Sequence, residues 1–296
     1  MSKGIVIFAS NNGLVDYIKI ACASAGFVRK NLSKFDEICL ITDSQSQKAN
    51  KRLIDKYFDK TIIQDATQSH PNIRLFKDTY EDSNYAPFIN MGRSDIYELS
   101  PYDETLVIDG DYFVMSNTLD QVWGSENDLM INCQYRDVSG RHGGNISYID
   151  DFSIPMYWAT VFYFKKSEYT ENLFYLISHI KENFRYYYFL YNCTGGQLFR
   201  NDFVFSMAIH ILNGRVDSKV PALPIEYLNN SFDMDDVFRV NSSNDIILYC
   251  AKPEKLTLHN LARFTNTDLH IMNKKGIERN IDTFLEKGQT LWVEAI

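Results

Sequence analysis

The chain has 296 residues, 45% of them hydrophobic, and a formal net charge of −8 at neutral pH. This length and apolar content suffice for a full hydrophobic core and fit one large α/β domain, with or without an appendage. The negative charge argues against a generic nucleic-acid-binding protein, although a local basic loop could still engage DNA.

Alternating strands and helices are predicted along the N-terminal part of the chain. Buried strands are expected at Gly4–Ala9, Glu37–Thr42 and Thr61–Ile63. Apolar side chains at helical spacing predict two helices between them, around residues 14–25 and 53–57. This alternation predicts a parallel sheet wound with right-handed crossovers.

The rest of the chain continues the pattern less regularly. The segment from about Ala86 to Leu99 is predicted to be a helix that leads into a short buried strand, Thr105–Ile108. Strands are then expected at residues 129–133 and 158–164, helices around 173–180 and 203–212, and strands at 223–227 and 246–250. Asn201 or Asp202 is expected to cap the helix at 203–212.

The five cysteines are expected to be buried free thiols in a reducing compartment. Their number is odd, most lie in apolar segments, and no Cys-x-x-Cys pair is present, so a zinc site is not expected. No targeting segment is visible, and the longest apolar run, Ile154–Phe164, is about half as long as a membrane span. We therefore expect a soluble, cytoplasmic protein without a membrane partner.

Two carboxylates separated by a glycine follow the predicted strand Thr105–Ile108. In an open α/β sheet, ligands bind beyond the carboxyl ends of the strands, which places Asp109 and Asp111 where a ligand would lie. Two like charges this close are unfavourable unless a cation neutralises them. Carboxylate oxygens suit Mg²⁺ or Mn²⁺ shared with a substrate phosphate. The motif therefore predicts a divalent ion that bridges the protein and a diphosphate, although Asp-Gly-Asp is also ordinary turn chemistry.

The order strand, helix, strand, then a helix and a hydrophobic strand ending in Asp-x-Asp resembles the GT-A fold of nucleotide-sugar glycosyltransferases. The pattern covers roughly residues 4–215, and the specific motif is Val107–Asp111. The resemblance implies an α/β fold with a Rossmann-like, mostly parallel central sheet flanked by helices, and Mn²⁺ or Mg²⁺ as cofactor. It also implies that Asp111 ligates the metal directly, that Asp109 touches the metal and the ribose, and that Gly110 belongs to the donor site.

The same resemblance assigns the rest of the donor site. Asp43, at the end of the second strand, matches a position that holds the nucleoside, and it could equally cap the following helix. Arg93 lies where glycogenin-like enzymes place a basic residue for phosphate and sugar, and Asp95 is the nearby acid for sugar hydroxyls. We expect both to be catalytic, with a uridine diphosphate sugar as donor. The nucleoside is expected at the turn after the first strand, formed by Ala9, Ser10, Asn11 and Asn12.

Many family members take a third metal ligand from a histidine near the C-terminus. His259 and His270 are the two candidates here. We favour His270, because Lys274 follows it within reach of a phosphate. The glycogenin-like His–Gly–Lys motif is not reproduced. His210 lies in an apolar helix and is expected to belong to the core.

The acceptor side is expected around the strand that follows Asp-x-Asp. The segment Pro155–Lys166 resembles the family strand that lines this side, which makes Tyr157 and Trp158 acceptor-binding candidates. Asp202 matches the acid that contacts the transferred sugar and is therefore a catalytic candidate, with a helix N-cap as its structural alternative. A glycine-containing loop beyond the strand at 129–133 could be a lid, an acceptor-gripping loop or a solvated loop; its cationic candidates are Arg136, Arg141 and His142.

The nature of the acceptor is the least determined expectation. The Tyr-Trp-Ala-Thr and His-Ile-Met-Asn-Lys stretches resemble phage-encoded transferases, which include enzymes that glycosylate hydroxymethylated bases. On that resemblance the acceptor is 5-hydroxymethylcytosine in phage DNA, and the protein acts in the host cytoplasm. Arg136, Arg141 and His142 would then contact phosphates, and the aromatic run Arg185–Phe189 would stack on bases. A saccharide, lipid-linked or protein acceptor is the alternative.

Two functions of other classes are also compatible with the sequence. A haloacid-dehalogenase-type phosphatase carries Asp-x-Asp after a strand, but usually near the N-terminus and with Thr or Val in the place of Phe113. A non-catalytic sugar-nucleotide-binding protein is the other. We expect residues 1–296 to form a single GT-A-like domain, with a nucleotide-sugar-binding half over about 1–125. The acceptor-binding half and a C-terminal extension are expected over about 126–296.

Overall fold

The computed structural model describes residues 1–65, 72–78, 82–89, 92–141, 148–150, 153–193, 198–216, 220–252 and 254–289. A six-stranded sheet forms the centre of the fold, built from β1 (Lys3–Phe8), β2 (Glu37–Thr42), β3 (Lys60–Ile63), β6 (Glu104–Asp109), β8 (Leu129–Ile131) and β10 (Val161–Lys165). The order of the strands across it is β3-β2-β1-β6-β10-β8.

The direction of the strands agrees with the expected mostly parallel sheet. β1 pairs in parallel with both β2 and β6, and β2 pairs in parallel with β3. β10 is antiparallel to β6 and to β8. The start of β10 therefore lies at the same edge of the sheet as the end of β6, and the segment before β10 lies beside Asp109.

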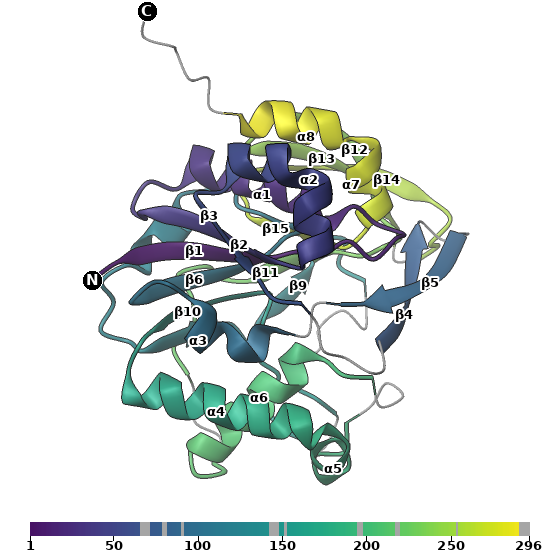
Figure 1. Cartoon of the computed structure of the whole chain (residues 1–296). Coiled ribbons are helices and arrows are strands. Elements are labelled where there is room, and N and C mark those ends of the chain that lie inside the picture. Colours follow the sequence, from purple (N-terminus) through teal and green to yellow (C-terminus); the bar gives the residue numbers. More distant parts are fainter. Residues whose placement is uncertain are drawn as a thin grey trace, which may run out of the picture.

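Helices cover both faces of the sheet (Figure 1). On one side lie α1 (Tyr17–Asn31), α2 (Ser44–Tyr57) and α8 (Ile281–Gly288), and on the other α3 (Ile96–Leu99), α4 (Glu168–Glu182), α5 (Phe184–Leu190) and α6 (Asn201–Leu212). α1 and α8 approach closely at Gly26 and Gly288. A Cβ atom on Gly26 would lie only 2.8 Å from the carbonyl oxygen of Gly288, so glycine is needed there. The expected α/β fold with flanking helices is confirmed.

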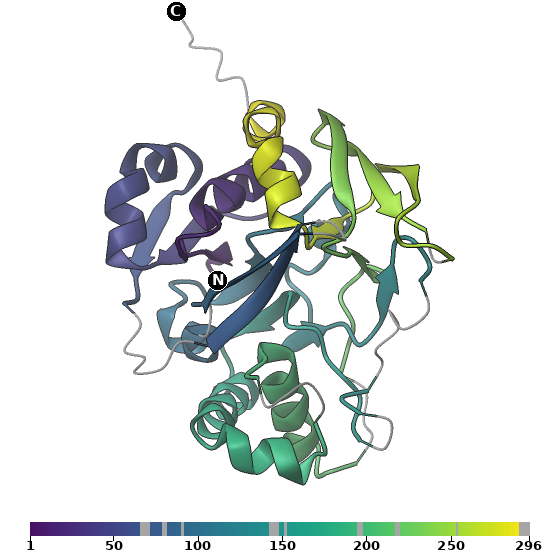
Figure 2. The same cartoon turned by 90° about the vertical axis from the view of Figure 1, so that its right-hand side faces the viewer.

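Three smaller sheets surround this core. A four-stranded sheet has the order β7-β15-β11-β9, a three-stranded sheet the order β12-β13-β14, and β4 and β5 form a hairpin. The hairpin lies at the edge of the central sheet opposite the N-terminus (Figure 1) and faces the viewer in Figure 2. The bounds are β4 (Asn72–Asp78), β5 (Asp82–Phe88), β7 (Tyr112–Phe113), β9 (Tyr135–Asp137), β11 (Leu228–Ser231), β12 (Asp236–Ser242), β13 (Asp245–Ala251), β14 (His259–Thr265) and β15 (Leu269–Ile271), with α7 at Lys274–Arg279 and the 3₁₀ turns η1 at Gly92–Asp95 and η2 at Thr118–Gln121.

The helix expected from about Ala86 to Leu99 is wrong over its first part. Residues up to Phe88 belong to β5, which pairs with β4 from Asn72↔Phe88 to Asp78↔Asp82, and only η1 and the short α3 are helical. Pairing with β4 in the same hairpin has overridden the local apolar spacing. The strand expected at 223–227 is also wrong, because β11 begins only at Leu228.

Apolar packing joins the two layers on the α1 side of the sheet. Phe27, Phe113 and Phe284 are fully buried and their ring centroids lie 4.5–5.8 Å apart. This cluster fixes α8 and β7 against α1. All five cysteines are free and four of them are buried, as expected. Within the described part of the chain, no helix is both long and apolar enough to cross a membrane.

Candidate functional site

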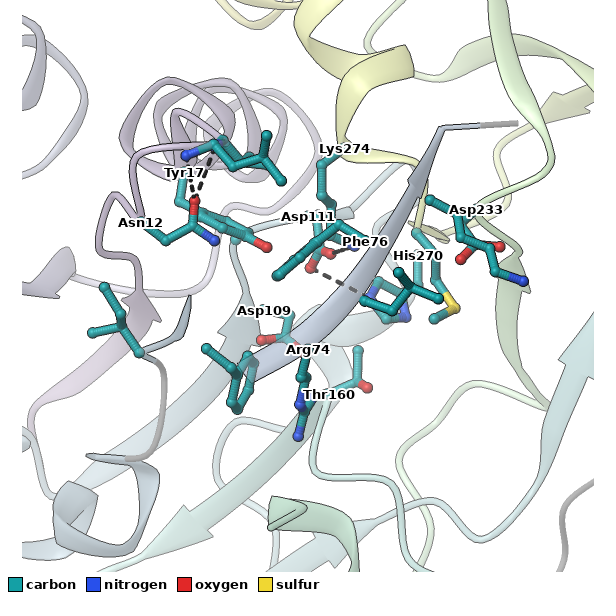
Figure 3. A pocket seen from close by; sticks show the side chains of 18 of the residues that line it. Asn12, Tyr17, Arg74, Phe76, Asp109, Asp111, Thr160, Asp233, His270 and Lys274 are labelled. Carbon is teal, nitrogen blue, oxygen red and sulfur yellow. Dashed lines mark hydrogen bonds and ion pairs between the residues drawn. The ribbon is translucent and has the colours of Figure 1, made fainter. Parts of the chain in front are cut away.

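A cavity of about 450 Å³ lies beyond the carboxyl ends of β1 and β6. Its described lining comes from the end of β1, the start of α1, the β4–β5 hairpin, the turn Asp109–Asp111, the segment before β10, the start of α6, and the C-terminal residues 270–275. Figure 3 shows Asp109, Asp111, Thr160, His270 and Lys274 around this cavity, with Arg74 and Phe76 reaching into it from the hairpin.

Asp109 and Arg93 meet at the edge of the central sheet. Asp109 is the last residue of β6, and its backbone N–H donates to the Thr160 carbonyl oxygen at 2.9 Å. Arg93, only 4% exposed, forms an ion pair with Asp109 and donates to the Ala159 carbonyl oxygen. Burial lowers the pKa of Arg93 to about 10, against the opposite effect of Asp202 and Asp111. The guanidinium is thus still a fixed positive charge at neutral pH.

The C-terminal segment reaches the site through a strand pair. β15 is antiparallel to β7, with His270 opposite Tyr112, and the Ile271 N–H donates to the Asp111 carbonyl oxygen at 3.0 Å. This pairing places His270 Nε2 3.3 Å from Asp111 Oδ1. Lys274, at the start of α7, forms an ion pair with the other oxygen of Asp111.

The expected metal ligands meet in a single cluster. One ligand atom each from Asp109, Asp111 and His270 lie within 4.8 Å of one another. Asn230 Oδ1 lies 2.6 Å from His270 Nδ1, and because a carbonyl oxygen only accepts, Nδ1 carries the proton. The lone pair of neutral His270 is then on Nε2, facing Asp111, as a ligand oriented by an outer partner requires. Two carboxylates and an imidazole fit Mn²⁺ or Mg²⁺.

The charge state of Asp111 supports this interpretation. Burial would raise its pKa, but the positive charge of Lys274 and the interaction with His270 outweigh burial and hold the pKa well below its usual range. Asp111 is therefore ionised at neutral pH. In the structure Lys274 contacts Asp111, so it would need to turn away from that carboxylate to reach a phosphate as expected.

The nucleoside end of the cavity is lined by Ala9, Ser10 and Asn12. Asn12 also shapes the turn, since its Oδ1 accepts from the Leu14 and Val15 N–H groups at 3.0 and 2.9 Å. The other two expected residues have structural positions outside the described lining. Asn11 accepts from the Ile18 N–H and donates to Asp16. Asp43 caps α2 by accepting from the Ser46 N–H at 2.7 Å. Of its two expected roles, the structure shows the helix cap.

The two acids expected to be catalytic differ in position. Asp202 lines the cavity, where it accepts from the Ala159 N–H at 3.0 Å and pairs with Arg200 at 3.1 Å. It does not cap α6, whose N-cap is Arg200. Asp95 lies outside the described lining and accepts from Gln64 Nε2 and Ser94 Oγ. In this structure its carboxylate holds η1, and a catalytic role for Asp95 stays a prediction.

The expected acceptor residues are brought together only in part. Trp158 lines the cavity and stacks on Tyr135 with ring centroids 4.7 Å apart. Tyr157 is directed elsewhere, because its hydroxyl oxygen accepts from the Val220 N–H at 3.2 Å. Arg136 is exposed, outside the described lining, and lies over the Tyr227 ring.

Arg141 is not available to an acceptor. Its side chain is 8% exposed and forms ion pairs with Asp137 and Asp235, whose side chains are 2% and 0% exposed. It ties β9 to the segment before β12, which corrects the expectation that it grips a phosphate. His142 lies outside the described residues.

The two candidate histidines lie on different sheets, His259 on β14 and His270 on β15. His259 lies on β14 of the three-stranded sheet, stacked on Tyr249 with ring centroids 4.6 Å apart. His210 is partly buried on α6, and its Nδ1 lies 3.1 Å from the Tyr191 hydroxyl. Only His270 of the three lies in the cavity.

We expect His270→Ala to weaken Mn²⁺-supported binding of uridine diphosphate by at least about tenfold, since loss of a ligand or its outer partner typically costs 10–100-fold in metal affinity. His259→Ala, a matched change outside the cavity, should bind as the unaltered protein does. Titration calorimetry with and without Mn²⁺ measures both. A larger loss in His259→Ala would exclude His270 as the metal ligand.

Several lining residues were not predicted from the sequence. They are supplied by elements that are distant along the chain: Tyr17, Arg74, Phe76, Lys77, Tyr135, Thr160, Arg200, Asn230, Asp233 and Lys275. Arg200 could have been found from its position next to Asp202. Arg74, Phe76 and Lys77 carry no such signal, because no sequence motif marks their segment and only the folded hairpin brings it to the cavity.

No family model matches this sequence, and no curated protein matches it. Similar solved structures include the glycosyltransferase GlyE of Streptococcus pneumoniae TIGR4, at 13% identity and a TM-score of 0.43 over 75% of this chain and 45% of that one. The match thus spans less than half of GlyE.

Two further structures show the range of proteins with comparable similarity. The galactosyltransferase LgtC, in complex with donor and acceptor sugar analogues, is 13% identical with a TM-score of 0.40, over 68% of both chains. The 4-diphosphocytidyl-2C-methyl-D-erythritol synthase of Anaerococcus prevotii is 14% identical with a TM-score of 0.36, over 74% of this chain and 86% of that one. At such low identity and TM-score, the residues of the cavity, and not these similarities, are the basis for a function.

Proposed function

We propose that this protein is a metal-dependent glycosyltransferase that moves a sugar from a nucleoside diphosphate sugar to an acceptor hydroxyl. The observation that carries the proposal is the cluster of Asp109, Asp111 and His270 beside two cations, Lys274 and Arg93, in one cavity at the carboxyl edge of the sheet. Such a set of ligands and positive charges suits a diphosphate and a divalent ion together.

The residues of the cavity have distinct roles in this proposal. Ala9, Ser10 and Asn12 lie where a uridine would bind, at the end of β1. Bound Mn²⁺ or Mg²⁺ supplies charge neutralisation at the diphosphate leaving group. Lys274 and Arg93 add positive charge on either side of the ligand cluster, which stabilises the leaving group further because the site is partly shielded from water.

Asp202 is the acid proposed to contact the transferred sugar. Its carboxylate is oriented by the Ala159 N–H and by Arg200, and the Ala159 carbonyl oxygen in turn accepts from Arg93. The Ala159 peptide groups therefore link the residue proposed for the phosphate to the residue proposed for the sugar.

The experiment is a panel of nucleotide sugars tested for thermal stabilisation with Mn²⁺, Mg²⁺ or EDTA. A ligand that binds the folded state raises the apparent stability by mass action, by about 2.7 kcal/mol at a concentration of 100 Kd. We expect uridine diphosphate sugars to stabilise most, and EDTA to remove the effect. Stabilisation that is indifferent to EDTA would contradict the proposed metal site, and preference for another nucleotide would overturn the uridine assignment.

Product analysis separates the other classes of function. A glycosyltransferase releases a nucleoside diphosphate, whereas a phosphatase releases inorganic phosphate and a nucleotidyltransferase releases pyrophosphate. Binding without any release would indicate a non-catalytic sugar-nucleotide-binding protein.

The acceptor is proposed to approach Trp158, Tyr135 and Arg200, which line the same cavity. DNA containing 5-hydroxymethylcytosine stays one acceptor to be tested beside saccharides and proteins. Of the basic loop residues proposed for DNA, only Arg136 is exposed among those described. Transfer to such DNA, and not to the same duplex with unmodified cytosine, is the result that would establish it.

A further inference from the structure

Arg74 places a positive charge in the lining of the cavity. It lies on β4 with its guanidinium carbon 3.5 Å from the Phe88 ring centroid, and its Nη2 donates to the Phe199 carbonyl oxygen at 2.6 Å. Among the described residues no carboxylate forms an ion pair with it. The two neighbouring guanidiniums, in contrast, each have one, Arg93 with Asp109 and Arg200 with Asp202.

The surroundings of Arg74 are unfavourable for a lone cation. Burial lowers its pKa to about 10, and the positive charge of Arg200 acts in the same direction. Asp202 compensates only in part, because it is already the partner of Arg200. At neutral pH the group keeps its charge. Among the described residues, Arg93 and Arg200 each have a carboxylate in an ion pair, whereas Arg74 has none.

Arg74 lies on the Asp109 side of the ligand cluster, away from Lys274 (Figure 3). Figure 3 shows Arg74 on the side of Asp109 and Thr160, whereas Lys274 lies on the far side of Asp111. Arg200 precedes α6 and lies over the rings of Trp158 and Phe203, 6.0 and 5.1 Å from their centroids. A guanidinium is planar and has five N–H donors, which match the oxygens of a carboxylate or a phosphate. Arg74 uses one of these donors in its hydrogen bond to Phe199.

The strand that carries Arg74 is fixed at several points. Asp78, at the end of β4, accepts from Arg279 at 2.6 and 2.9 Å and from Asn273 at 3.2 Å. Asn12 Nδ2 donates to the Pro87 carbonyl oxygen on β5 at 3.1 Å. The guanidinium is thus held in place before any ligand arrives, which reduces the entropy cost of binding an anion.

We propose that Arg74 and Arg200 form a subsite for an anionic group, a carboxylate or a phosphate, carried by the acceptor. This inference rests on the proposed function, because it names the class of acceptor that the transferase takes. An acidic saccharide or a sugar phosphate supplies a negative charge to this subsite, while Trp158 and Tyr135 provide an apolar surface beside it.

The direct test is binding of glucuronate, glucose 6-phosphate and neutral glucose, measured by calorimetry in EDTA and without nucleotide. We expect the two anions to bind at least tenfold more tightly than glucose, and Arg74→Gln and Arg200→Gln each to remove this preference. Arg263→Gln is the matched control, since Arg263 pairs with Asp245 on the three-stranded sheet outside the cavity. Thermal unfolding checks that each variant is folded. Equal affinity for glucose and glucuronate, or unchanged affinity in folded Arg74→Gln, overturns the proposal.

Two further measurements separate this subsite from the donor site. If Arg74→Gln weakens binding of Mn²⁺–uridine diphosphate as strongly as binding of glucuronate, Arg74 serves the diphosphate and the proposal fails. If the loss is confined to uridine diphosphate glucuronate compared with uridine diphosphate glucose, the anion belongs to the transferred sugar and the acceptor assignment fails. Because the glucuronate assay needs neither metal nor donor, its result does not depend on whether the chain proves to be a glycosyltransferase.

Discussion

Replacing Asp111 by asparagine is expected to reduce sugar transfer by at least about a hundredfold while leaving the protein folded. Asparagine keeps the shape of the side chain but removes the negative charge that a divalent ion needs, and outer partners of metal ligands alone are worth 10–100-fold. Asp111 is also the shared partner of Lys274 and His270, so the variant changes the charge at the centre of the site.

Initial rates at increasing Mn²⁺ concentration, together with thermal unfolding, measure the effect of Asp111→Asn. The matched control is Asp245→Asn, which removes a carboxylate paired with Arg263 far from the cavity and should keep its transfer rate. Full activity of Asp111→Asn would refute the proposed metal site.

Replacing Arg141 by methionine is expected to destabilise the protein by about 3–5 kcal/mol, the usual cost of removing one partner from a buried ion pair. Asp137 and Asp235 would be left as two buried carboxylates without a counter-charge. Urea unfolding measures the loss. Arg136→Met, an exposed change of the same kind, should stay within about 0.5 kcal/mol. A loss below about 1 kcal/mol in Arg141→Met would show that the pair is not important for stability.

The stabilisation that Arg141 provides through Asp137 is expected to depend on pH. Burial would raise the pKa of Asp137, but the hydrogen bonds and charge of Arg141 outweigh burial and lower it. A carboxylate with a depressed pKa contributes stability above its unfolded pKa of about 3.9, and this contribution is lost as the pH falls through the folded pKa. The difference between Arg141→Met and the unaltered protein should therefore shrink as the pH is lowered below about 4.

Local sequence predicted the elements that depend on neighbouring residues. β1, β2 and β3 lie within one residue of the predicted strands, and a helix follows each of the first two as expected, although α1 ends six residues later and α2 begins nine residues earlier than the apolar spacing indicates. Asp109 and Asp111 could also be predicted as site residues, because the strand, the turn and the two carboxylates are contiguous in the sequence. The cap of α2 at Asp43 was likewise one of two alternatives visible in the sequence.

The errors arise where pairing or packing with another segment decides the structure. The apolar spacing after Ala86 fits a helix, whereas residues up to Phe88 pair with β4 in a hairpin, and no sequence motif marks Arg74 on β4. Arg141 lies in a segment with the composition of a solvated loop, yet Asp235, from another part of the chain, helps to bury it. The resemblance favours His270 as a metal ligand, and in the structure the pairing of β15 with β7 is what brings it beside Asp111.

That last pairing has a consequence for how the molecule assembles. More than half of the chain separates Asp111 from His270, so the loop that must close before they meet is long, and contacts of this kind form slowly. Until β15 pairs with β7, His270 is not beside the two aspartates. On the proposed function, a divalent ion would therefore bind its three ligands only after this pairing, and its binding energy would oppose the separation of β15 from β7.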